Sequence, residues 1–267
     1  MRRKNYKHDM TAFFMRNEKG QIAIFVIIAV VIVALLLIFL FYPKLPFISK
    51  TGELSPISYL KSCIEPDLKK NVETLSNNAG YSNPEGVLEY QGDKIKYLCY
   101  TAEYYKTCVV QQPLIKEHFE QELNVLMKEK TQTCVQNLKT EYEKRGYEVS
   151  LGKIDSRASI NPGNILIAIN SPMSVKKSGS SQSFSGFNVE MKSEMYDLVM
   201  IGVSVIDFES SAGDSETTLY MQYYPSLKIE KTRLGEGSKV YRLTNVETNE
   251  SFRFASRSLV WPPGYGI

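Results

Sequence analysis

The chain has 267 residues and a formal net charge of +3 at pH 7, and 43% of its residues are hydrophobic against 23% charged. These proportions are typical of a globular protein and exclude a disordered chain. The positive charge is concentrated before position 20, which leaves 26 basic and 27 acidic residues from totals of 32 and 29. The near-neutral remainder argues against a nucleic-acid-binding domain.

The first predicted element is an apolar helix from Ile22 to Tyr42, a run of 21 residues without a charge, a proline or a glycine. At about 1.5 Å per residue this helix is roughly 32 Å long, which matches the hydrocarbon core of a bilayer. A secretory signal peptide has a shorter apolar stretch followed by a small-residue cleavage site, and Tyr42-Pro43-Lys44 offers none. We therefore expect a transmembrane helix over 21–42.

Six cations precede this helix and few follow it closely, so the positive-inside rule places the N-terminus in the cytoplasm. The expected organisation is a single-pass protein of the cell membrane with four parts. They are a cytoplasmic basic leader over 1–20, the transmembrane helix over 21–42, a linker over 43–55 and an extracellular domain over 56–267.

Lys19, Gly20 and Gln21 stand directly before the apolar run. This junction resembles the archaeal class III, prepilin-type signal peptide of type IV pilin-like proteins. In that family a prepilin peptidase cuts after the glycine, and the helix stays on the mature protein as part of a filament core. The resemblance implies cleavage between Gly20 and Gln21. The partners it implies are membrane lipid, the peptidase and other pilin-like subunits.

One residue departs from the pattern of that family. Pilin-like members usually carry a Glu at the fifth position after the cut, where this chain has Phe25. A carboxylate inside the membrane needs a partner, and in pilins a neighbouring subunit supplies it. The resemblance therefore favours a minor, accessory or merely anchored member over a major pilin. An anchor that is never cleaved is the alternative interpretation.

The outer region also resembles, in layout, surface proteins of small-genome archaea. The likeness rests on Ser62-Cys63-Ile64 in a helix and on the aromatic segment from Phe252 to Ser258. Because no activity is assigned to those proteins, the resemblance implies no catalytic residues.

The first part of the outer domain, 56–146, is predicted to be mainly helical. Ser55-Pro56 is typical of an N-cap followed by proline at the first helical position, and apolar residues then recur every three or four positions as far as Gly80. Pro66 should kink or interrupt this helix. A second helix is expected from Gln112-Pro113 to Gly146. Between the helices, 94–100 alternates like a strand, and 104–110 could return beside it.

All four cysteines, Cys63, Cys99, Cys108 and Cys134, follow the apolar helix. An even number in an exported domain predicts two disulfides, for which three pairings are possible. We favour Cys99–Cys108, which would close the short hairpin. We pair Cys63 with Cys134 because both lie on the apolar faces of the two helices. Four reduced, buried cysteines are the alternative.

The second part, 147–267, is predicted to be rich in strands. A hairpin is expected over 148–160 and 165–170 with a Pro162-Gly163 turn, and another over 175–189 around a Ser-rich tip. A third helix should begin near Met191 and end near Gly213. Further strands are expected over 219–224, 227–232, 239–245 and 251–260. About three helices packed on antiparallel sheet define the fold class of the extracellular domain as α+β.

No pattern of residues indicates an enzyme, a cofactor site or a metal site. Of the two histidines, His118 lies between Glu117 and Glu120 on a helix and is expected on its solvated surface. The cysteines are not spaced as close pairs of zinc ligands. Ser58-Tyr59-Leu60-Lys61 matches the Ser-x-x-Lys element of penicillin-binding enzymes, but the companion motifs are missing.

Tyrosine is the one residue type in excess, with 17 in the chain. It gathers in two groups that form a possible contact surface: Tyr97, Tyr100, Tyr104 and Tyr105, and Tyr220, Tyr223 and Tyr224. Exposed tyrosines suit protein or glycan contact, because each offers apolar area and a hydrogen bond. The alternative is that these tyrosines are half-buried structural residues of strands.

The sequence therefore predicts a membrane-anchored, pilin-like surface protein, minor or accessory, that acts by protein or glycan contact. The first alternative is a tethered extracellular binding or sensing domain that does not polymerise. The second is an envelope hydrolase, which requires a deep cleft with acidic residues close together.

Overall fold

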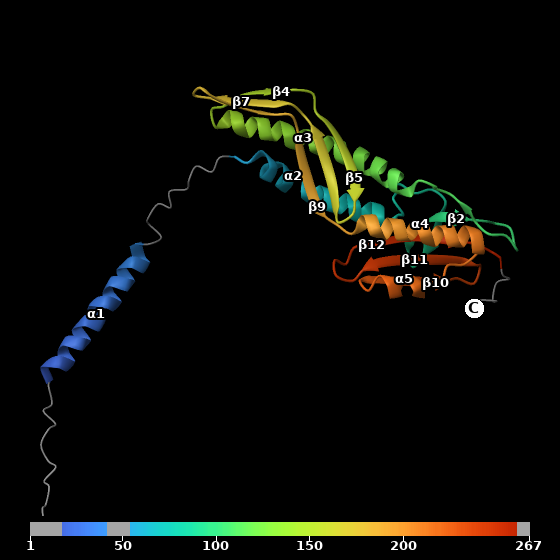
Figure 1. Ribbon diagram of the computed structural model, residues 1–267, viewed down its shortest axis with the longest axis horizontal. Helices are drawn as coiled ribbons and strands as arrows, with labels where there is room; N and C mark the ends of the chain where they lie inside the picture. Colours follow the sequence, from blue (N-terminus) through green and yellow to red (C-terminus); the bar gives the residue numbers. More distant parts are fainter. Residues whose placement is uncertain (1–17, 42–53, 261–267) are drawn as a thin grey trace, which may run out of the picture. The chain divides into compact units, whose positions relative to one another are not determined.

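The computed structural model describes residues 18–41 and 54–260, and these form two compact units divided after Glu53 (Figure 1). Most of the predicted leader, the linker over 43–53 and the last residues from Trp261 onward lie outside the described residues.

The first unit contains helix α1, Glu18–Phe41, which begins three residues before the predicted boundary. Gly20 and Gln21 lie in its first turn. The described side chains of α1, from Phe25 to Leu37, are exposed, with Phe25 at 72%. Among the helices over 18–41 and 54–260, none is both long and apolar enough to span a membrane.

The second unit begins with the predicted helix α2, Pro56–Asn77. Its start is as expected, because the Ser55 hydroxyl accepts a hydrogen bond from the Ser58 amide at 3.4 Å. The expectation that Pro66 interrupts the helix is wrong. Pro66 lies on the exposed face, so water can bind the carbonyl that lost its amide partner, while buried Ile64 and Leu68 fix the helix on either side.

Helix α3, Ile115–Lys144, packs along α2 (Figure 1). The disulfide Cys63–Cys134 joins the two helices with a Cα–Cα distance of 5.9 Å. The second disulfide, Cys99–Cys108, spans nine positions and closes the loop between β2 and β3 at its base, next to the paired residues Cys99 and Val110. Both pairings are those that the sequence favoured.

Three long, bent strands cross α3, and each is divided into two pieces. The pieces form two three-stranded antiparallel sheets, in the orders β4-β7-β8 and β5-β6-β9. Their bounds are β4 Glu148–Leu151, β5 Asp155–Asn161, β6 Asn164–Asn170, β7 Met173–Lys177, β8 Ser180–Phe184 and β9 Phe187–Lys192. The Pro162-Gly163 turn forms as predicted, with Gly163 at a φ of +77°.

The hairpin expected over 175–189 around the Ser-rich tip forms from β7 and β8, which pair from Met173–Phe184 to Lys177–Ser180. The expectation of an unbroken strand over 148–160 is wrong, because the chain bends along a line through Gly152, Pro172 and Gly186. The Gly152 amide donates to the Pro172 carbonyl at 2.8 Å. At Gly186 a Cβ atom would lie 2.5 Å from the Ile169 carbonyl oxygen, so only glycine fits. Met191 belongs to β9, and the third helix therefore begins later than expected.

Two side chains of α3 close the open edge of β5. The Asn124 side-chain oxygen accepts from the Ala158 amide at 2.5 Å, and the Glu120 carboxylate accepts from the Ile160 amide at 2.9 Å. An unpaired strand edge is a template for pairing with another chain. These contacts satisfy that edge within the domain.

A third sheet, of six strands, has the order β1-β2-β12-β11-β10, with β3 paired to β2. Its strands are β1 Val87–Tyr90, β2 Asp93–Tyr100, β3 Val109–Val110, β10 Leu227–Arg233, β11 Ser238–Asn245 and β12 Ser251–Arg257. Strands β2 and β12 are parallel, which the antiparallel expectation did not include, and β1 was not predicted.

Helix α4, Met195–Ala212, covers one face of this sheet and ends at Gly213, whose φ is +85°. The predicted strand over 219–224 is instead a short helix, α5, Thr218–Tyr223. The Glu216 carboxylate accepts from the Thr218 amide at 2.8 Å and caps its first turn. The described residues thus form an α+β fold.

The disulfides should differ in their contribution to stability. Loop-closure entropy predicts a loss of about 4 kcal/mol of unfolding free energy for Cys63→Ala/Cys134→Ala, and about 2.5 kcal/mol for Cys99→Ala/Cys108→Ala. The difference arises because the first bridge spans 71 positions and the second nine. Urea unfolding of the purified full chain measures both values. A larger loss for the shorter loop would contradict this ranking.

Candidate contact surface

A buried carboxylate organises the end of α4. Glu209 has no exposed surface and accepts hydrogen bonds from the Lys239 ammonium at 2.7 and 2.9 Å, from the Ser256 hydroxyl at 3.0 Å and from the Tyr241 phenol. Lys239 also donates to the Gly213 carbonyl at 2.7 Å. Every polar atom at the centre of this network has protein partners, so a buried charge pair is tolerated.

Asp214 extends the network to two more cations. Its carboxylate contacts Lys239 at 3.0 Å, Lys231 at 2.5 Å and Arg233. Burial opposes ionisation of Asp214, but the bonds from Lys231 and Lys239 outweigh it and lower its pKa to about 2. Burial, followed by the charge of Glu209, raises the pKa of Tyr241 far above its ordinary value. The phenol therefore stays protonated and acts as a donor.

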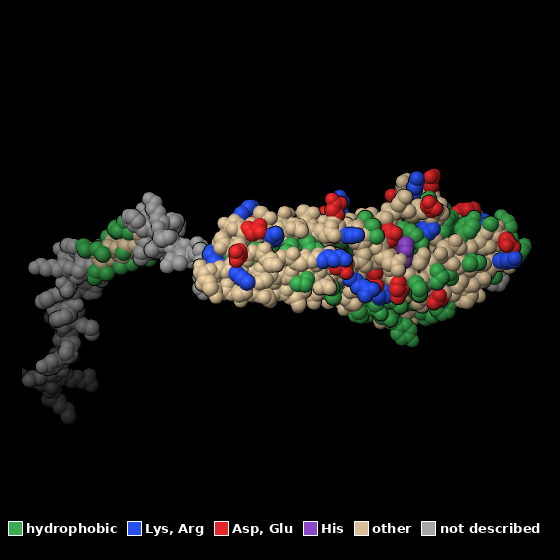
Figure 2. Space-filling model, turned by 90° about the horizontal axis from the view of Figure 1, so that it is seen from above, with side chains coloured by type: hydrophobic (Ala, Val, Ile, Leu, Met, Phe, Trp, Pro, Cys, Tyr) green, Lys and Arg blue, Asp and Glu red, His purple; other side chains and the backbone are tan. Residues whose placement is uncertain are grey.

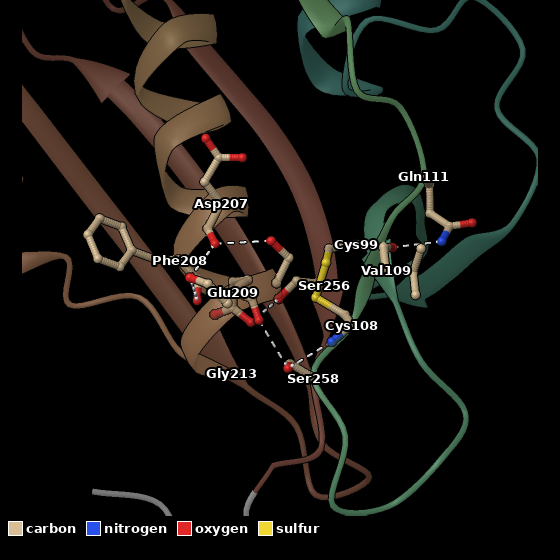
Figure 3. The surroundings of a disulfide bond; sticks show 12 residues. Cys99, Cys108, Val109, Gln111, Asp207, Phe208, Glu209, Gly213, Ser256 and Ser258 are labelled. Carbon is tan, nitrogen blue, oxygen red and sulfur yellow. Dashed lines mark hydrogen bonds between the residues drawn. A yellow bond between two sulfur atoms is a disulfide. The ribbon is translucent and has the colours of Figure 1, made fainter.

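The Cys99–Cys108 loop is attached to this network through Ser258 (Figure 3). The Cys108 amide donates to the Ser258 hydroxyl at 3.1 Å, and that hydroxyl donates to the Glu209 carbonyl at 3.2 Å. Further along the loop, the Tyr105 amide donates to the Leu259 carbonyl at 2.7 Å. The loop is therefore held against α4 and the chain that follows β12.

The first group of tyrosines lies on and beside this loop. Tyr104 and Tyr105 are 58% and 73% exposed, and Tyr100 is 38% exposed. Tyr97 differs from them: its hydroxyl bonds to the Ser238 hydroxyl at 2.7 Å, and its ring meets that of Tyr100 edge-on at 5.0 Å. Tyr97 therefore has a structural role, and three of the four tyrosines are available for contact.

The second group lies on α5 and extends onto α4. Tyr223 is 81% exposed and Tyr224 is 51% exposed. The Tyr220 hydroxyl bonds to the Ser204 hydroxyl at 2.7 Å and so ties α5 to the outer face of α4. Met200 and Phe208 lie one turn on either side of Ser204 and are themselves exposed.

We call the exposed residues Met200, Phe208, Leu219, Tyr223 and Tyr224 the α4–α5 surface. Figure 2 shows hydrophobic side chains gathered along the stretch that α4 occupies in Figure 1. Met200 and Phe208 are not among the contact residues expected from the sequence. Both are apolar residues on the solvent-facing side of α4. The sequence shows this only when the helix is given its true bounds, Met195–Ala212.

His118 is not the solvated residue that its neighbours in sequence suggested. It is half-buried, its ring centre lies 4.1 Å from that of Tyr81, and burial lowers its pKa. No group of three or more metal-ligating side chains is found over 18–41 and 54–260.

Comparisons of the chain with models of protein families, with curated proteins and with solved structures found no match.

Removal of the buried Lys239 cation should strongly destabilise the folded domain. Lys239→Met leaves the Glu209 charge buried without its counter-ion, and we expect a loss of about 3–5 kcal/mol of unfolding free energy. Lys228→Met is the control, because Lys228 forms an exposed pair with Glu230 that contributes at most about 1 kcal/mol. Chemical denaturation measures both. Equal effects of the two substitutions would show that the network is not stabilising.

The low pKa of Asp214 gives a pH dependence with a defined sign. The folded state binds this proton less readily than the unfolded state, so stability is lost as pH falls from about 3.8 to about 2. Asp214→Asn should lower stability at pH 5 and weaken this part of the acid dependence. Urea unfolding at pH 5, 4, 3 and 2 measures the two slopes. Identical slopes for the wild type and the variant would refute the assignment.

Proposed function

We propose that this chain is a single-pass, membrane-anchored surface protein, pilin-like and minor or accessory, whose extracellular domain acts by contact. The observation that carries the proposal is the uncharged segment from Ile22 to Tyr42, directly preceded by Lys19-Gly20-Gln21 and a basic leader. An uncharged run of this length suits the hydrocarbon core, and the cations before it favour a cytoplasmic N-terminus.

The disulfides support the extracellular placement. Both bridges lie after the apolar segment, and no free cysteine is left in the described residues. Disulfides form and persist in oxidising compartments and are rare in the cytosol. Two bridges in one domain therefore favour export of that domain.

The α4–α5 surface supports action by contact with another protein. Contiguous exposed apolar side chains of this kind are typical of interaction sites. Asp197 and Asp207 flank it on α4, are exposed, and form no ion pair with another described residue. A partner that fits would present apolar side chains together with lysine or arginine, because these would complement both the apolar area and the negative rim.

A second candidate function is a tethered binding or sensing domain that does not polymerise. Phe25 favours it, because the carboxylate that pairs neighbouring pilin subunits is missing at this position. Electron microscopy of surface filaments with an antibody to the outer domain separates the two candidates. Labelled filaments support the pilin-like form, and label confined to membranes supports the tethered domain.

Processing of the leader tests the pilin-like identity. We expect the mature chain from native membranes to begin at Gln21, because the prepilin peptidase would cut after Gly20. Gly20→Val should leave the leader in place, whereas Gly235→Ala, outside the junction and with open space around an added Cβ, should not affect cleavage. Mass spectrometry of the N-terminal peptide measures the start. A mature chain that begins upstream of Gly20 would rule out the pilin-like part of the proposal.

A further inference from the structure

The outer face of the β5-β6-β9 sheet carries an open groove of about 640 Å³ that the contact surfaces do not include. A groove of this size lies within the range of small-ligand sites. It follows the line where the strands bend, and the first turn of α2 forms one wall with Ile57, which is 56% exposed. The groove therefore combines a polar strand surface with one apolar wall.

Strand register places the polar side chains of the groove in two adjacent rows. Arg157, Ala168 and Asn188 lie directly opposite one another across the three strands. Two positions along the strands, and therefore in the next row on the same face, Asp155 lies opposite Asn170. Residues opposite one another share a face, with their Cβ atoms about 5 Å apart. Ala168 is the small residue between two long ones, so the centre of the row is hollow.

The other face of the same strands is apolar and fully used by the core. Ala158, Ile167 and Val189 are paired in register and buried, with exposures of 3%, 1% and 1%. The alternation fixes which residues face outward, because a slip of one position would bury the polar row. The groove is thus built on a rigid support.

The polar groups of the groove are free to bind a ligand. Among the described residues, the side chains of Arg157, Asn170 and Asn188 form no hydrogen bond with the protein. Asp155 accepts one, from the Ser156 amide at 3.1 Å, and retains its other oxygen. Arginine only donates, ionised aspartate only accepts, and asparagine does both.

We propose that this groove binds a neutral saccharide. The charges of Asp155 and Arg157 cancel, so the groove has no preference for a charged ligand. A ligand that satisfies it must offer donors and acceptors at close spacing, which neighbouring sugar hydroxyls do. The apolar CH face of a sugar ring can pack on Ile57. This inference deepens the proposed function, since it gives one chemical class for the contact.

A peptide fits the groove less well. The central strand β6 is paired on both sides, so a peptide strand cannot add to the backbone at the floor of the groove. Side-chain anchors of a peptide would need apolar pockets, and the floor of this groove is a single alanine between polar residues. Preferential binding of peptides is therefore an outcome that would contradict the proposal.

The test uses the full chain in phosphatidylcholine nanodiscs, because maltoside detergents would occupy a sugar site. The discs are applied to an array of neutral oligosaccharides (glucans, mannans, galactans and N-acetylglucosamine oligomers), acidic oligosaccharides and peptides. Arg157→Ala and Asn188→Ala should each weaken binding roughly tenfold, the equivalent of one or two hydrogen bonds. Ala168→Leu should abolish it by filling the floor.

Glu190→Ala is the matched control. Glu190 is exposed on the same face of β9, two positions beyond Asn188 and outside the groove, so its removal should leave binding unchanged. Each variant is first shown to keep the thermal unfolding transition of the wild type. Discs that contain a neutral glycolipid separate two sources of the ligand: reduced array binding by such discs indicates a membrane source, and unchanged binding a free or envelope glycan.

The proposal is overturned if the folded wild type binds no neutral oligosaccharide, if it prefers acidic glycans or peptides, or if Ala168→Leu binds as well as the wild type. None of these results depends on cleavage after Gly20. Failure of the saccharide site is therefore distinguishable from failure of the pilin-like proposal.

Discussion

The buried carboxylate of Glu209 is the interaction on which the contact surface depends. It lies near the end of α4, and its partners come from β11 and β12, so helix and sheet are joined by charge as well as by apolar packing. A buried ion pair is expensive unless its remaining hydrogen-bonding positions are filled, and here Ser256, Tyr241 and the Gly213 carbonyl fill them. The same residues orient the segments that carry the exposed tyrosines. Ser258 connects the disulfide loop to α4, and Asp214 binds the cations of β10 close to α5.

The domain uses two different means to keep its sheets from unwanted pairing. The edge of β5 is closed by polar side chains of α3, whereas β10 alternates charged and apolar residues, with Lys228 and Glu230 paired on its outer face. At these two edges, contact with another chain is therefore left to side chains. The α4–α5 surface and the sheet groove are two side-chain surfaces, built on separate sheets and suited to different chemistry.

Local signals in the sequence were sufficient for the elements whose ends depend on backbone chemistry. Ser55-Pro56, Pro162-Gly163 and Gly213 mark a helix start, a turn and a helix end because proline, glycine and a capping hydroxyl act within a few residues. The favoured disulfide pairing followed from the apolar faces of two amphipathic helices. The helix over 18–41 was expected from the uncharged apolar run between Ile22 and Tyr42, and its placement in a membrane stays a prediction.

Features that depend on tertiary contacts could not be predicted from local signals in the sequence. Pro66 is tolerated because it faces solvent, and α5 is helical where strand propensity was high because Glu216 caps it and Tyr220 binds Ser204. Glu209 is one of 29 acidic residues, and nothing local distinguishes it from the exposed ones. Of the seven tyrosines in the two groups, Tyr97 and Tyr220 are partly buried and the other five are exposed. The structural role of Tyr97 depends on a strand more than a hundred residues away in the sequence.

The central claim, an outer domain carried by an N-terminal anchor, is tested most directly by labelling intact cells with a membrane-impermeant amine reagent and mapping the labelled lysines by mass spectrometry. The account predicts label on exposed domain lysines such as Lys153 and Lys192 and none on Lys4 or Lys7. Label on Lys4 and Lys7 with an unlabelled domain would contradict it.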